Sequence, residues 1–287
     1  MTKRAIQAFD TAVAKGESRL LDAKARSSVP GQYVDLADGV VRYELAGPPD
    51  GQVVVLVHGF FNACFVWDHA FAALARAGFR VLRYDLYGRG YSDRPVTRYD
   101  RDLYDRQLVN LLEALEITRP VDLVGASMGG AIALIFADRY PAAVRRLCLI
   151  DPSGMYPRHE RLARIVRVPV LGELLIGLRC RTARFPEQVR AFLQYRGTRR
   201  AFLSTIRHGP FGDVSDVYER VGEREIPTLL IWGREDEAIP FAFSKRVRQA
   251  IPHAEFHAID GTGHKPYYEQ PDRVNPLLIG FLDRRLA

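Results

Sequence analysis

The sequence has few cysteines, few lysines and no long apolar run. Its 287 residues include three cysteines, Cys64, Cys148 and Cys180, none close to another in the sequence. This spacing predicts neither a metal-binding knuckle nor a disulfide framework. No stretch approaches the roughly eighteen apolar residues of a membrane span. Residues 1–28 also lack the continuous apolar segment of a signal peptide. We therefore expect a cytoplasmic protein without an integral membrane span.

Lysine is scarce because arginine carries most of the positive charge. The chain has 36 arginines, five lysines and a formal net charge of +7. Residues 155–225 hold fourteen arginines and eight acidic residues, a balance of +6. No nucleic-acid-binding module accompanies these arginines, so we expect no nucleic-acid partner. A solvated basic face is favoured over attraction to acidic substrates or to a membrane surface.

Short apolar runs alternate with amphipathic stretches along the chain. The expected strands cover residues 32–36, 40–46, 53–57, 80–84, 121–124, 147–150, 228–232 and 255–259. The expected helices cover residues 67–77, 101–115, 129–139, 241–249 and 273–286. Several strands are continuous apolar runs, which is typical of a parallel sheet covered on both faces. Asp38-Gly39 predicts a hairpin between the first two strands, and hence an antiparallel edge. The pattern predicts an α/β fold, doubly wound around a mostly parallel eight-stranded sheet.

One long interval interrupts this alternation. Residues 155–225 contain no strand-like run, and so long an insertion is rarely without structure in a compact domain. We expect a helical cap there, between two halves of an α/β core at residues 31–154 and 226–287. Residues 1–30 are expected to form a helical extension, because residues 3–25 carry a loose apolar stripe. This helix is expected to pack on the body or on a partner rather than on a membrane surface.

A small serine lies between an apolar strand pattern and an apolar helix pattern, in Gly125-Ala126-Ser127-Met128-Gly129-Gly130. The arrangement of strand, G-x-S-x-G and helix is that of a nucleophile elbow, in which small residues let the backbone close around the serine. The hydroxyl would then lie at a helix N-terminus, which favours developing negative charge. The motif alone could also be a structural turn, so it needs partners.

Serine is a weak nucleophile at neutral pH and needs a base that is oriented by an acid. Both follow in the expected order, each just after a predicted strand: Asp236 in GREDEAIP and His264 in GTGHKP. His264 lies between glycine-rich loop residues, whereas the other six histidines lack a catalytic context. For the acid, Glu235, Glu237 and Asp151 compete with Asp236. Asp151 ends another strand and is the main alternative.

The carbonyl oxygen of a substrate needs backbone donors as it becomes negative. His58-Gly59 directly follows a buried strand, and Gly59 permits a turn that presents the N–H of Phe60. The N–H of Met128 is the second expected donor. His58 is interpreted as a side chain that organises the loop, and His58, Gly59, Phe61 and Leu175 are expected to line the substrate pocket. The loop DLYGRGYSDRP at 85–95 is expected to support this side of the site.

With these segments together, the chain resembles the α/β-hydrolase superfamily over roughly residues 34–286. The resemblance rests on HGF at 58–60, DLYGRGYSDRP at 85–95, GASMGG at 125–130, GREDEAIP at 233–240 and GTGHKPYYEQP at 261–271. It implies Ser127 as nucleophile, His264 as general base and then acid, Asp236 as orienting carboxylate, and Phe60 and Met128 as oxyanion donors. It implies no metal and no organic cofactor.

Departures from subgroup patterns narrow the choice. Dehalogenases and soluble epoxide hydrolases of this fold have an aspartate where this chain has Ser127. Meta-cleavage C–C hydrolases carry a loop with glycine and proline after His-Gly, where this chain has Phe60-Phe61-Asn62-Ala63. The chain looks most similar to capped serine esterases and monoacylglycerol-lipase-like members, which implies a small-molecule ester substrate. The alternatives are a cofactor-free perhydrolase or haloperoxidase, a meta-cleavage hydrolase, and a ligand receptor with little turnover. The pattern does not determine the oligomeric state.

Overall fold

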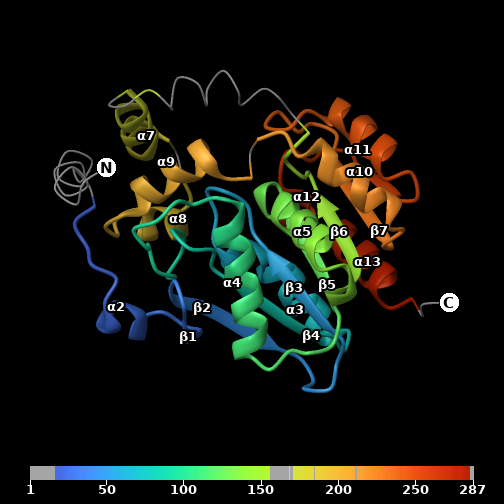
Figure 1. The fold of residues 1–287 in the computed structure, drawn as a ribbon, viewed down its shortest axis with the longest axis horizontal. Helices are drawn as coiled ribbons and strands as arrows, with labels where there is room; N and C mark the ends of the chain where they lie inside the picture. Colours follow the sequence, from blue (N-terminus) through green and yellow to red (C-terminus); the bar gives the residue numbers. More distant parts are fainter. Residues whose placement is uncertain (1–16, 156–167, 169–170, 184, 211, 285–287) are drawn as a thin grey trace.

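A single mixed sheet forms the centre of the molecule. The computed structural model describes residues 17–155, 168, 171–183, 185–210 and 212–284. Within these residues, eight strands pair in the order β1-β2-β4-β3-β5-β6-β7-β8 (Figure 1). Their bounds are β1 Gln32–Leu36, β2 Gly39–Ala46, β3 Val53–Val57, β4 Arg80–Tyr84, β5 Val121–Ala126, β6 Val144–Ile150, β7 Thr228–Gly233 and β8 Glu255–Ile259. The predicted fold class is confirmed.

The direction of the strands decides where their ends meet. β1 and β2 form an antiparallel hairpin closed at Leu36 and Gly39, and β2 pairs antiparallel with β4. All pairs from β4 to β8 are parallel. The carboxyl ends of six strands therefore lie along one edge, where the loops of α/β proteins gather their functional groups.

Helices cover both faces of the sheet. Side chains along β3 alternate between two cores: Val54 and Leu56 pack in one, and Val53, Val55 and Val57 in the other. The first core includes residues of α3 (Asp68–Arg76), α12 (Pro266–Glu269) and α13 (Pro271–Leu282). The second includes residues of α4 (Arg101–Ala114), α5 (Met128–Arg139), α10 (Ser215–Glu223) and α11 (Ser244–Ala250). Because apolar side chains point both ways, the strand sequences lack a polar face.

Some element boundaries differ from those that the sequence predicts. The sixth strand starts at Val144, whereas the sequence predicts a start at residue 147. The prediction starts late because Arg145 and Arg146 interrupt the apolar run. Arg145 forms an ion pair with the buried Asp122 of β5, and Arg146 lies over the ring of Phe281 at 5.9 Å. Because these charged side chains have partners inside the fold, the apolar pattern failed to predict the first three residues of the strand.

The interval between β6 and β7 is helical where the structure describes it. It contains α7 (Leu171–Thr182), α8 (Glu187–Leu193), α9 (Thr198–His208) and α10. In Figure 1, α7, α8 and α9 lie together beyond one end of the sheet. By contrast, α10 contacts the core helices α5 and α11. The division of the chain into extension, core and cap stays a prediction. No helix in the described ranges has the length and apolar character that crossing a membrane requires.

The expectation of a helix over residues 3–25 is wrong for residues 17–22. Residues 17–22 are not helical, and the short α2 covers Ala23–Ser27 instead. The N–H of Arg19 donates to Gln194 O at 3.1 Å, and Arg19 O accepts from Arg196 N at 2.9 Å. These bonds to the segment before α9 take the place of helical ones. Residues 1–16 lie outside the described part.

Glu17 joins this N-terminal segment to the start of α9. Its buried carboxylate accepts hydrogen bonds from Gly197 N at 2.9 Å and from Arg199 N at 2.6 Å. These N–H groups belong to the first turn of α9 and have no partner within the helix. The side chain therefore caps a helix that lies 180 residues away in the sequence.

We predict that Glu17→Ala lowers the free energy of unfolding by about 1–3 kcal/mol, because it leaves buried N–H donors without acceptors. Glu17→Gln keeps an acceptor and should cost less. Chemical denaturation measures both, with the exposed Glu219→Ala on α10 as control. Equal stability of Glu17→Ala and the control would contradict the capping role.

Candidate active site

Ser127 lies in a strained turn between β5 and α5. Its φ is 55° and its ψ is −120°, a left-handed region that residues with a side chain rarely occupy. The turn is held because Ser127 N donates to Ile150 O at 2.9 Å and Ser127 O accepts from Gly130 N at 3.0 Å. Met128 directly follows as the first residue of α5. Strain of this kind is typical of functional sites.

The glycines around Ser127 are required by close backbone contacts. A Cβ on Gly125 would lie 2.3 Å from Gly129 O, and one on Gly129 would lie 2.1 Å from Val57 O. A Cβ on Gly59 would lie 3.2 Å from the Cβ of Ser127. The segment after β3 therefore lies directly against the elbow. We call it the oxyanion segment because it carries the expected donor Phe60.

His264 and Asp236 form a direct hydrogen bond. His264 Nδ1 lies 2.7 Å from Asp236 Oδ2, and the other carboxylate oxygen accepts from Ala238 N and Ile239 N at 2.8 Å each. The Asp236 side chain is fully buried, whereas that of His264 is 25% exposed. Because Nδ1 faces the acid, the imidazole has Nε2 free for a second partner.

Contacts between neighbouring loops bring the elbow and the histidine to one edge of the sheet. Ser153 N, in the segment after β6, donates to Ser127 O at 3.0 Å. In that segment Asp151 accepts a hydrogen bond from Gly233 N at 2.9 Å. The end of β7 in turn touches the histidine loop, since a Cβ on Gly233 would lie 2.0 Å from Gly263 O.

The same edge groups three possible metal ligands. One ligand atom each of Asp151, Asp236 and His264 lies within 4.8 Å of the others. However, His264 Nδ1 is bonded directly to Asp236, which leaves no place for an ion between them. Within the described residues, the hydrogen bond between His264 and Asp236 therefore explains why two of these three side chains lie together.

Other histidines have different environments. His257 pairs with Glu255 at 2.7 Å, and His253 bonds to Ile226 O at 2.9 Å. His69 and His208 are exposed, and His159 lies outside the described residues. None of the described four shares a hydrogen bond with a buried acid of the kind that holds His264.

The expectation that His58 lines the substrate pocket stays a prediction, and the structure shows what holds this side chain in place. Its side chain is completely buried, and both ring nitrogens have partners. Nε2 accepts from Leu86 N at 3.0 Å, and Nδ1 donates to Gly59 O at 2.7 Å. His58 therefore organises the loop, as the sequence also indicated. Burial lowers the pKa of His58 to about 4, because the charged imidazolium loses its hydration.

The loop at 85–95 supports the segment after β3, as expected. Asp85 Oδ1 accepts from Cys64 N at 2.8 Å, and Arg89 Nε donates to Phe60 O at 3.2 Å. Both side chains are completely buried. Together with the bond from Leu86 N to His58, they fix the backbone around Phe60.

Arg89 is a supporting residue that sequence reasoning missed. Its guanidinium donates to the hydroxyl of Tyr104 at 2.7 Å and lies 4.9 Å and 5.0 Å from the ring centroids of Phe60 and Phe202. It thus connects the loop after β4 to the oxyanion segment and to α9. Burial lowers the pKa of Arg89. The signal was an arginine between two glycines, but its burial depends on helices distant in sequence.

Three aromatic rings pack around Phe61 in the oxyanion segment. Phe61 contacts Phe60 at 4.5 Å, Phe202 at 5.2 Å and Phe185 at 5.4 Å between ring centroids. Phe61 and Leu175 are half-buried and pack on the same core, so both remain candidates for the pocket. Phe192 of α8 is buried, and it lines a different cavity.

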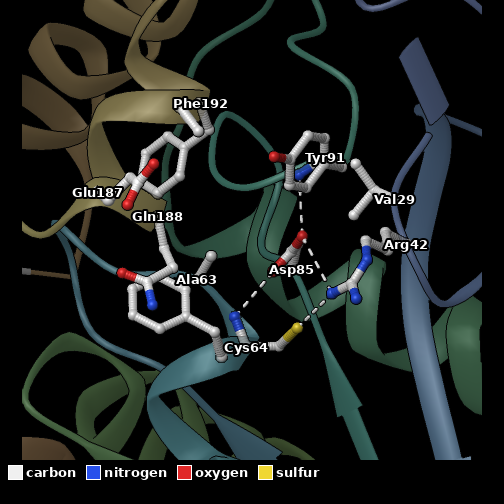
Figure 2. A pocket seen from close by; sticks show the side chains of 11 residues that line it. Val29, Arg42, Ala63, Cys64, Asp85, Tyr91, Glu187, Gln188 and Phe192 are labelled. Atoms are coloured by element: carbon white, nitrogen blue, oxygen red, sulfur yellow. Dashed lines mark hydrogen bonds and ion pairs between the residues drawn. The ribbon is translucent and has the colours of Figure 1, made fainter.

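That cavity has a volume of about 350 Å³ and lies between α8, β2 and the segment after Phe61. Figure 2 shows Asp85 and Arg42 at its base, beside Cys64 and Tyr91. Asp85 already accepts from Cys64 N and Tyr91 N at 2.8 Å each, so its polar base is internally satisfied. Ser127, Asp236 and His264 are not among the lining residues. We therefore locate the candidate active site at the elbow and not in this cavity.

A family model described as "Alpha/beta hydrolase family" matches residues 54–277. An enol-lactonase from Burkholderia xenovorans has the same fold, with a TM-score of 0.73, 22% identity, and coverage of 88% of this chain and 100% of that chain. The fold and the arrangement at its carboxyl edge define an α/β hydrolase. The chain belongs to the alpha/beta hydrolase family.

Two relatives in this family are similar over nearly their whole length. A 2-hydroxy-6-oxo-6-phenylhexa-2,4-dienoate hydrolase from Comamonas testosteroni is 31% identical, over 88% of this chain and 94% of that protein. A 2-hydroxy-6-oxononadienedioate/2-hydroxy-6-oxononatrienedioate hydrolase from Burkholderia vietnamiensis is 31% identical, over 90% and 97%. These comparisons support hydrolysis as the general class of reaction.

We predict that Gly129→Ala lowers the free energy of unfolding by about 1–3 kcal/mol, because the added methyl group forces backbone apart at the elbow. Gly280→Ala on α13 is the matched control. A Cβ at Gly280 meets nothing within 4 Å, and alanine in a helix is favoured over glycine by about 0.5–1 kcal/mol. Equal effects of the two substitutions, measured by denaturation, would contradict the close packing of the elbow.

The buried His58 should make stability depend on pH. Between pH 6.5 and about 4 the unfolded chain binds a proton at His58 that the folded chain does not, so stability falls as the pH falls through this window. Across this window, the neutral His58 contributes about 3 kcal/mol to the free energy of unfolding. We predict that His58→Gln removes this part of the pH dependence. Denaturation at pH 7 and pH 4.5 measures it, and an unchanged dependence would contradict a neutral buried His58.

Proposed function

We propose that the protein is a serine hydrolase that cleaves carboxylic esters through an acyl-enzyme. The observation that carries the proposal is the buried Asp236–His264 pair, 2.7 Å apart, at the sheet edge that also presents Ser127 in its strained turn. A base held by an acid beside a serine at a helix N-terminus is the arrangement that nucleophilic acyl transfer needs.

In the proposed reaction, Ser127 Oγ attacks the ester carbonyl while His264 Nε2 takes the hydroxyl proton. The carbonyl π electrons move onto oxygen, and the N–H groups of Phe60 and Met128 stabilise that charge; each donor of this kind contributes about 3–4 kcal/mol in other hydrolases. The C–O bond then breaks, and His264 protonates the leaving alcohol. Water repeats the sequence on the acyl-enzyme and releases the acid.

The surroundings of the oxyanion segment favour an apolar substrate. Phe60, Phe61, Phe185 and Phe202 form a continuous group of rings, and apolar surface binds acyl or aryl groups by excluding water. Within the described residues, two arginines lie over these rings: the buried Arg89 over Phe60 and Phe202, and the exposed Arg179 over Phe185 at 5.8 Å. Because Arg89 is fully buried, it is not positioned to bind an anionic substrate group from solvent.

A second candidate is hydrolysis of a carbon–carbon bond next to a ketone. The relatives named as dienoate hydrolases favour it, since they match most of this chain. The first steps at Ser127 would be the same, because a ketone carbonyl is attacked in the same way. Against it stands the segment Phe60-Phe61-Asn62-Ala63, which lacks the glycine and proline that the family resemblance implies for that subgroup.

The decisive experiment measures kcat/KM for two substrate sets. One is a series of p-nitrophenyl esters from acetyl to palmitoyl, and the other is 2-hydroxy-6-oxo-6-phenylhexa-2,4-dienoate. We expect ester cleavage to exceed dienoate cleavage, and Ser127→Ala to lower it by at least about a thousandfold. Preference for the dienoate would favour the second candidate. Ester turnover that persists in Ser127→Ala would overturn the serine mechanism for both.

A further inference from the structure

Asp151 has an unusual backbone conformation for a residue at the end of a strand. Its φ is 42°, and among the described residues other than glycine this left-handed region is shared by Ser127, Glu116 and Glu225. Two of these four residues therefore flank the candidate site. The conformation turns the Asp151 carboxyl toward the end of β7, where Oδ1 accepts from Gly233 N at 2.9 Å.

The second oxygen of Asp151 is the unexplained group. Oδ2 is buried and has no hydrogen-bond partner if the carboxyl is taken as ionised. A buried carboxylate oxygen without a donor is costly. Within the described residues, the titratable groups that face Asp151 are Asp236, Glu269, Tyr267 and, within 4.8 Å, His264. Two of these four are acids.

The Asp236 carboxylate has more hydrogen-bond donors around it than Asp151 has. It accepts from two backbone N–H groups, those of Ala238 and Ile239, and is bonded to His264. Two buried carboxyls in contact do not both ionise, and the negative charge stays on the one with more donors. Burial, and then the charge of Asp236, raise the pKa of Asp151 well above its ordinary range.

We propose that Asp151 is a neutral carboxylic acid whose Oδ2–H donates to the Asp236 carboxylate, and that it thereby positions the acid that orients His264. This inference rests on the proposed function, but it names a further residue of the same site. It accounts for the buried oxygen without a partner and for the strained backbone that holds the carboxyl in place. Asp151 is a positioning residue in this arrangement, since it touches Asp236 and not the substrate.

Asp151→Asn is the sharpest test. An asparagine there can accept from Gly233 N and donate to Asp236 without ever carrying charge, so it imitates a neutral acid. We expect kcat to change by no more than about threefold, and the acid limb of the pH profile of kcat/KM to stay in place. Removal of a nearby negative charge would instead move that limb by about one pH unit. Such a shift would overturn the proposal.

Two further variants separate positioning from other roles. Asp151→Leu cannot donate to Asp236, and we expect it to lower kcat about tenfold, the loss that follows from one hydrogen bond. Asp236→Asn should lower kcat by about ten-thousandfold, as removal of an orienting carboxylate does in other hydrolases. If Asp151→Asn lost as much activity as Asp236→Asn, Asp151 would be the orienting acid and the proposal would be wrong.

An infrared difference spectrum tests the protonation state without any substrate. At pH 7, the wild type minus Asp151→Asn should show a carboxylic-acid C=O band that shifts on exchange into D₂O. Carboxylate bands from the wild type in this difference spectrum, in place of the carboxylic-acid band, would overturn the proposal. Because this readout needs no turnover, it distinguishes failure of the Asp151 assignment from failure of the proposed ester hydrolysis, which the Ser127→Ala substrate test addresses.

Discussion

The site depends on one steric constraint, the backbone turn at Ser127. A residue with a side chain adopts a positive φ there only because its surroundings hold it. The glycines on either side let the carbonyls of the neighbouring strand and of the elbow itself approach so closely that no methyl group would fit. This close approach presents the serine hydroxyl at the start of α5 and places the segment that carries Phe60 beside it.

Two sets of buried polar groups fix the position of the turn relative to the other loops of the site. On one side, His58, Asp85 and Arg89 attach the segment after β3 to the loop after β4. On the other side, Asp151 and Asp236 attach the ends of β6 and β7 to the histidine loop. Both sets use backbone N–H or carbonyl groups as partners, so these side chains also fix the positions of the loops.

Much of this arrangement could be predicted from the sequence, for a physical reason. Strands covered on both faces must be apolar throughout, so runs such as VVVLV and TLLIW reveal the sheet. A tight elbow needs small residues at fixed offsets, so GASMGG reveals the turn. What could not be predicted depends on contacts between distant segments. Residues 17–22 form no helix because Arg19 bonds to the segment before α9. Arg89 is buried because Phe202 of α9 covers it, and His58 is completely buried because both ring nitrogens bond to backbone groups.

The proposed chemistry requires that His264, held by Asp236, activates Ser127. The most direct measurement is the rate of covalent labelling by a fluorophosphonate probe, followed by peptide mapping, in the wild type and in His264→Ala. We predict a single modified residue, Ser127, and labelling at least about a hundredfold slower in His264→Ala, since general-base assistance contributes about 10²–10⁴ in rate. Labelling at another residue, or labelling of Ser127 at the same rate without His264, would contradict it.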